Sequence, residues 1–78
     1  MVTVESIASV LSAQQQAVLA LFATGLHSAE VAAALGTPVG EVRAHLVSAV
    51  VELGARSKLE AVIIALRLGL IDLPPEPA

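Results

Sequence analysis

Four cationic side chains carry most of the chemistry that this sequence offers. They are Arg43, Arg56, Lys58 and Arg67. Arg56 and Lys58 flank Ser57 at the expected start of a helix, where free backbone amides add to the two charges and could hold one phosphate. The alternative interpretation of this cluster is a helix cap next to a structural arginine. Arg43 lies in the segment GTPVGEVRAHL, residues 36–46, which has the form of a turn that enters a helix.

No set of residues points to catalysis, a metal or a cofactor. The chain has two histidines, His27 and His45, and no cysteine, so we expect neither a zinc site nor a disulfide framework. Residues 36–40 are too short for a phosphate-binding loop and lack its lysine. We therefore expect a binding module without enzymatic activity, metal or cofactor.

Length and composition favour one small helical domain. The chain has 78 residues, of which 56% are hydrophobic, and Phe22 is its only aromatic residue. The core must therefore be built from Ala, Val, Leu and Ile, which favours tightly packed helices. The net charge of −3 argues mildly against nucleic acid as a partner. Between residues 11 and 71, however, the four bases are balanced by four acids, Glu30, Glu41, Glu52 and Glu60.

Neither a membrane span nor a signal peptide is expected. Residues 6–29 lack charged side chains, but their longest apolar run, residues 17–23, is shorter than the roughly 20 residues that a span needs. No basic segment opens the chain, as a signal peptide would require. The prediction is a soluble, cytoplasmic protein without a membrane partner.

Helix caps and glycines divide the chain into four expected helices. Capping boxes open the first helix at Ser12 and Gln15 and the last at Ser57 and Glu60. The expected helices run from Ser12 to Gly25, from His27 or Ser28 to Gly36, from Pro38 to Leu53 with Thr37 as its cap, and from Lys58 to Leu68. The residues expected to face inward are Val18, Leu21, Phe22, Val31, Ala32, Leu35, Val39, Val42, Leu46, Ala49, Val50, Leu53, Val62, Ala65 and Leu66.

These elements predict a compact all-α domain of four helices over residues 11–71. Residues 1–10 are expected to form a lead or a short helix, and residues 72–78 a disordered Pro-rich tail. On the third helix, Glu41, Ser48 and Glu52 are expected opposite the buried stripe, on or beside the outward face.

Residues 11–71 resemble the LuxR-type helix-turn-helix domain, the DNA-binding end of many bacterial response regulators and quorum-sensing activators. The pieces that carry the resemblance are Leu11-Ser12, Val18-Leu19, Gly25-Leu26, Glu30-Val31-Ala32, Leu35-Gly36, Val42, His45, Leu53-Gly54, Arg56-Ser57, Glu60-Ala61-Val62 and Gly69-Leu70-Ile71. Residues 35–46 are also similar to the promoter-reading domain of extracytoplasmic-function sigma factors. The expected fourth helix favours the LuxR type, because the sigma domain ends after its recognition helix.

The resemblance implies a transcriptional regulator that binds double-stranded DNA, with the helix of about residues 38–53 in the major groove. The DNA-binding residues that it implies are Arg43, Ala44, His45, Val47, Arg56, Ser57 and Lys58. Arg43 could bond bidentately to guanine, which is worth about 1 to 3 kcal/mol of discrimination, and Ala44 and Val47 could touch a thymine methyl. The alternative interpretation of Arg43 is a solvated arginine paired with a nearby acid. Ala44 and Val47 would then be plain helix surface.

The resemblance also implies a homodimer through the fourth helix. The expected interface consists of Ile63, Ile64, Arg67 and Leu70. A surface helix normally has one apolar stripe, so the additional apolar residues of this helix need burial. The alternative is a densely packed core within one subunit. Because positions commonly basic in the family are Ala29, Gly40, Leu46 and Glu52 here, we expect binding to depend on two half-sites. A second hypothesis is a helix-turn-helix fold with weakened DNA binding, used as a protein-protein interaction or dimerisation module that pairs with a larger regulator protein.

Overall fold

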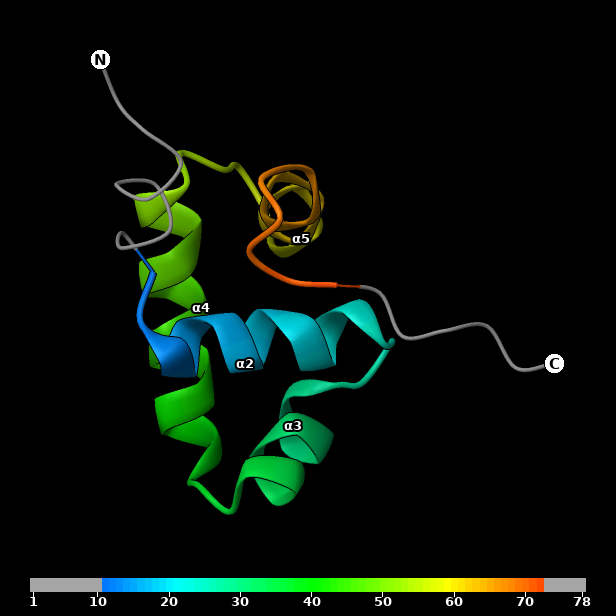
Figure 1. Ribbon diagram of the computed structural model, residues 1–78. Helices are drawn as coiled ribbons and strands as arrows, with labels where there is room; N and C mark the ends of the chain where they lie inside the picture. Colours follow the sequence, from blue (N-terminus) through cyan, green and yellow to red (C-terminus); the bar gives the residue numbers. More distant parts are fainter. Residues whose placement is uncertain (1–10, 73–78) are drawn as a thin grey trace, which may run out of the picture.

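The computed structural model describes residues 11–72, which form four α-helices joined by short connections (Figure 1). The helices are α2 Ala13–Ala23, α3 Ser28–Leu35, α4 Val39–Glu52 and α5 Lys58–Arg67. Residues 11–72 contain no strand, so the predicted all-α class with four helices is confirmed. The lead expected over residues 1–10 and nearly all of the tail expected over 72–78 lie outside this part of the chain. None of the four helices is long and apolar enough to cross a membrane.

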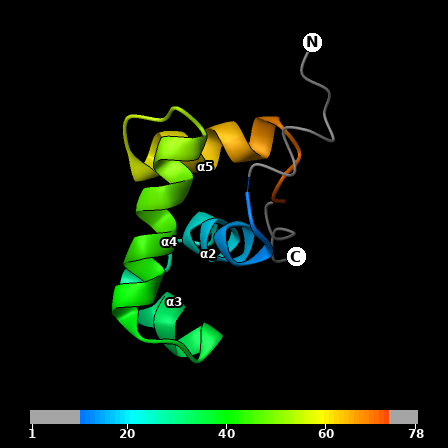
Figure 2. The ribbon, with the colours of Figure 1, turned by 90° about the vertical axis from the view of Figure 1, so that its left-hand side faces the viewer.

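Helix α2 is the centre of the domain. It packs against α3, α4 and α5, and it crosses α4 near the middle of that helix (Figure 1). The turned view shows that α5 lies at a steep angle to α4, near the end of α4 (Figure 2). Helix α3 lies close to the beginning of α4. One long side of α4 therefore carries none of the other three helices.

The core is built almost entirely from aliphatic residues. Its buried members are Leu11, Val18, Leu19, Phe22, Val31, Ala32, Val42, Ala49, Ala61, Val62, Ala65 and Ile71. Leu19, Val18, Val31 and Val42 are its largest fully buried side chains. Small residues such as Ala49, Ala61 and Ala65 let neighbouring helices approach closely, which is how a domain with one aromatic residue fills its interior.

Two residues expected to face inward are exposed. Leu35 is 36% exposed and Val39 is 37% exposed. They are the last residue of α3 and the first residue of α4, on either side of the turn between these helices. At a helix end only part of a side chain meets a neighbouring helix, so the helical period alone overestimated their burial.

Helix α4 begins one residue later than predicted. Gly36 adopts the left-handed conformation (φ 66°), and the Thr37 amide then donates to the Ala32 carbonyl at 3.1 Å. Because Thr37 completes the end of α3, the chain stays extended through Pro38, which is the N-cap of α4. The prediction of Thr37 as the cap and Pro38 as the first helical residue is therefore wrong.

The predicted capping box at the start of α2 is confirmed, and it extends to α4. The Gln15 amide donates to Ser12 Oγ at 3.1 Å, and the Ser12 amide donates to Gln15 Oε1 at 2.7 Å. Gln15 Nε2 also donates to Ser48 Oγ at 2.8 Å. Ser48, which was predicted on or beside the outward face, is therefore a half-buried link between α2 and α4.

Substitution of Ser48 tests this link. Ser48→Ala leaves the buried Gln15 amide without its partner, so we expect the free energy of unfolding to fall by about 1 to 2 kcal/mol. Urea denaturation followed by circular dichroism measures the loss. The double variant Gln15→Leu, Ser48→Ala removes both polar groups and should recover most of it. Full stability of Ser48→Ala would show that the hydrogen bond contributes nothing.

Candidate nucleic-acid interface

One side of α4 carries none of the other three helices and bears a line of four residues, here called the outer strip. The outer strip consists of Gly40, Ala44, Val47 and Val51, and all four are exposed. At about 100° per residue, they lie within an arc of about 60° that faces away from the buried Val42 and Ala49. Val47 is 63% exposed and Val51 is 72% exposed. No side chain of the outer strip can donate or accept a hydrogen bond.

Charged residues lie on both flanks of the outer strip. Arg43 is exposed on one flank, and Glu41 and Glu52 are exposed on the other, as the helical period places them. Within residues 11–72, no hydrogen bond or ion pair engages the Arg43 guanidinium. Its five donors are therefore available to a planar acceptor such as a guanine edge.

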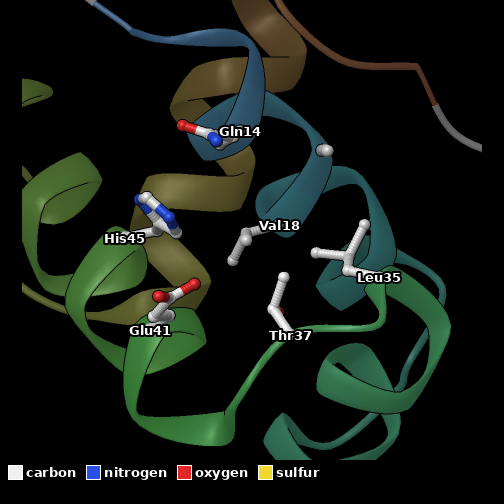
Figure 3. Close-up of a pocket in the computed structure, with 7 residues that line it drawn as sticks. Gln14, Val18, Leu35, Thr37, Glu41 and His45 are labelled. Atoms are coloured by element: carbon white, nitrogen blue, oxygen red, sulfur yellow. The ribbon is translucent and has the colours of Figure 1, made fainter.

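His45 lies on a different side of α4 from the outer strip. It is half-buried and lines a hollow of about 210 Å³ between α2, the end of α3 and α4. Figure 3 shows His45 and Glu41 reaching from α4 toward Val18 on α2. In this position His45 packs within the domain, whereas its contact with DNA stays a prediction. Residues 11–72 contain no group of three His, Asp or Glu residues that could hold a metal ion.

The cluster of Arg56, Ser57 and Lys58 lies at the start of α5, and all three residues are exposed. Ser57 Oγ accepts from the Glu60 amide at 3.1 Å, as predicted. Glu60 Oε1, however, accepts from the Arg56 amide at 3.1 Å and not from the amide of Ser57. The predicted reciprocal capping box is therefore only half present, and the carboxylate of Glu60 lies beside the cluster that should bind phosphate.

Lys58 makes a contact that the sequence analysis missed. Its Nζ atom lies 4.6 Å from the centre of the Phe22 ring, so the ammonium group rests on the face of an aromatic ring. The contact joins the first turn of α5 to α2 and restricts the position of the charge. Neither residue type nor spacing indicated this pair, because Lys58 and Phe22 lie far apart in the chain.

The exposed side of α5 is more apolar than predicted. Ile63 is 38% exposed and Arg67 is exposed, while Ile64 and Leu70 are half-buried. Leu59, which the sequence analysis did not include, is 68% exposed and lies one turn before Ile63. The spacing of four residues between Leu59 and Ile63 was the signal that could have identified it.

Comparison with known proteins agrees with this geometry. The family model described as bacterial regulatory proteins, luxR family, matches residues 9–65. No curated protein and no solved structure matches the chain. The matched residues include all of α2, α3 and α4, together with most of α5.

Proposed function

Because the chain belongs to the luxR family of bacterial regulatory proteins, whose helix-turn-helix domains bind DNA, we propose that it is a sequence-specific transcriptional regulator that places α4 in the major groove. The observation that carries this proposal is the long side of α4 on which none of the other three described helices packs. Arg43 lies on the flank of this side and has no partner within residues 11–72. A regulator of this kind acts on chromosomal DNA, so we also propose a cytoplasmic location.

One set of residues would contact the bases of the DNA, and another set would contact its phosphates. Arg43, Ala44 and Val47 face the bases, while Arg56, Ser57 and Lys58 hold phosphate at the start of α5. Arg56 and Lys58 are only two phosphate-binding cations per subunit. Glu41 and Glu52 oppose the DNA charge. One subunit alone should therefore bind DNA weakly.

A second subunit compensates for this weak binding. The exposed apolar residues of α5 support a homodimer whose interface contains Leu59, Ile63, Ile64, Arg67 and Leu70. Burial of Leu59 and Ile63 removes apolar surface from water, and two linked DNA-binding helices then engage two half-sites. The proposed assembly is a twofold dimer on a palindromic operator.

One observation favours a second candidate function. The outer strip is apolar along its whole length, and such a strip could pack against a partner protein instead of DNA. In that case the domain would be an interaction module that pairs with a larger regulator protein.

Selection of DNA from a random pool tests the proposed function. The protein is incubated with duplexes that contain a randomised centre, and bound duplexes are amplified and sequenced over several rounds. We expect enrichment of an inverted repeat, because a twofold dimer reads the same half-site twice. A pool whose composition stays unchanged while the protein remains folded would contradict sequence-specific binding and favour the interaction module.

A further inference from the structure

We propose that Val47 and Val51 read the 5-methyl groups of two thymines in each operator half-site. The inference rests on the proposed function, because it names the DNA sequence that α4 would select. It goes further by assigning Val51 to the site and by giving the chemical basis of the choice. Thymine is the only DNA base that presents a methyl group in the major groove.

The outer strip leaves few other means of reading bases. Hydrogen-bonding side chains lie only on its flanks, with Arg43 on one and Glu41 and Glu52 on the other. The strip itself offers only apolar contact. The two valines are more than half exposed in the free protein, so each has apolar surface to bury against a methyl group. Apolar contact with thymine methyls is the direct readout that such side chains can perform.

Helix geometry gives the spacing of the bases. Arg43, Val47 and Val51 follow one another at intervals of four residues, and each interval rises about 6 Å along α4. Base pairs are stacked about 3.4 Å apart along the DNA axis, and a helix in the major groove lies obliquely to that axis, so one interval spans about one to two base steps. The predicted half-site therefore has a guanine and two thymine methyls, with about one to two base steps between successive contacts. Each thymine can belong to either strand.

Replacement of thymine by uracil tests the inference at the level of one methyl group. Starting from the enriched duplex, each thymine of a half-site is replaced in turn by deoxyuridine, and the dissociation constant is measured by fluorescence anisotropy. We expect a loss of about three- to fivefold in affinity at two positions, because each replacement removes one buried methyl group. Deoxyuridine outside the half-sites should leave the affinity unchanged.

Protein variants connect each methyl group to its residue. Val47→Ala should abolish the effect of deoxyuridine at one position, and Val51→Ala should abolish it at the other. Both positions are exposed and alanine is a better helix former than valine, so both variants should stay folded. Val39→Ala is the matched control, since Val39 lies on α4 outside the outer strip and should leave both effects intact.

The outcomes separate the two proposals. If an enriched duplex binds equally well after every thymine is replaced, then methyl reading is wrong while sequence-specific binding stands. Methyl effects that persist in both valine variants would likewise overturn the assignment to these residues. If selection enriches no duplex, the proposed function fails, and methyl reading fails with it.

Discussion

Ile63→Glu converts the protein to a monomer and lowers its affinity for a two-half-site duplex by about 10²- to 10⁴-fold, if α5 forms the dimer interface. Ile63 is 38% exposed in a single subunit, so its replacement by a charged residue leaves the core in place. In a dimer the same carboxylate would be buried against the partner, and that burial is costly without a paired charge. Sedimentation equilibrium measures the mass, and a DNA titration measures the affinity.

Val39→Glu provides the matched control for the sedimentation experiment. Val39 is 37% exposed, and the added carboxylate lies in the first turn of α4, where the helix dipole favours a negative charge. This variant should keep the mass of the wild-type protein. A wild-type protein that is already monomeric at micromolar concentration, or an Ile63→Glu variant that remains a dimer, would contradict the interface.

Arg43→Ala should remove most of the sequence preference while the domain stays folded. We expect the affinity for the selected duplex to fall about tenfold to a hundredfold, because a bidentate contact with guanine is lost. The affinity for random duplexes should fall much less. The fold should survive because Arg43 is exposed and has no partner within the described residues 11–72. Circular dichroism and paired titrations with selected and random DNA measure these effects.

Two further substitutions give the Arg43 experiment its controls. Arg43→Lys keeps the charge but lacks the planar pair of donors, so it should retain affinity for random DNA and lose the preference for guanine. Arg56→Ala removes an exposed arginine that is assigned to phosphate and not to a base, so it should weaken binding to both duplexes while preserving the preference for guanine. Unfolding of Arg43→Ala would instead assign this residue a structural role. Equal losses on both duplexes in a folded variant would assign it a phosphate contact and contradict base reading.

The local features of the fold could be predicted from the sequence because they depend on neighbouring residues. Ser12 and Gln15 are three residues apart, so their capping box forms within one helical turn. Gly36 ends α3 because its left-handed conformation is favourable without a side chain. Such signals were sufficient to identify four helices in order and to predict most of the buried residues.

Features that depend on distant parts of the chain could not be predicted in this way. Ser48 pairs with Gln15 across 33 residues, and no local pattern identifies its partner. The contact of Lys58 with Phe22 likewise requires α5 to lie on α2. The helical period placed Ser48 near the outer face, and only the packing of α2 against α4 places it at their contact.

The candidate site likewise contains residues that the sequence predicted and residues that it did not. Arg43, Ala44 and Val47 could be chosen because the family resemblance assigns roles to their positions. Val51 and Leu59 were missed because residue type alone does not separate an exposed aliphatic residue from a core residue. Their four-residue spacing from Val47 and Ile63 was the signal that the sequence offered. Their exposure is a property of the packed domain.

The central claim is that this domain binds DNA although its positive and negative side chains balance. The salt dependence of binding tests this claim most directly. The protein is titrated with a selected duplex and with a random duplex while the salt concentration is raised from about 50 to about 200 mM. We predict binding to both duplexes at the lowest salt, tighter for the selected one. The logarithm of the affinity should fall with the logarithm of the salt concentration with a slope no steeper than about −4, the limit for four phosphate-binding cations in a dimer. No binding to either duplex at about 50 mM salt, where phosphate contacts are strongest, would contradict the claim.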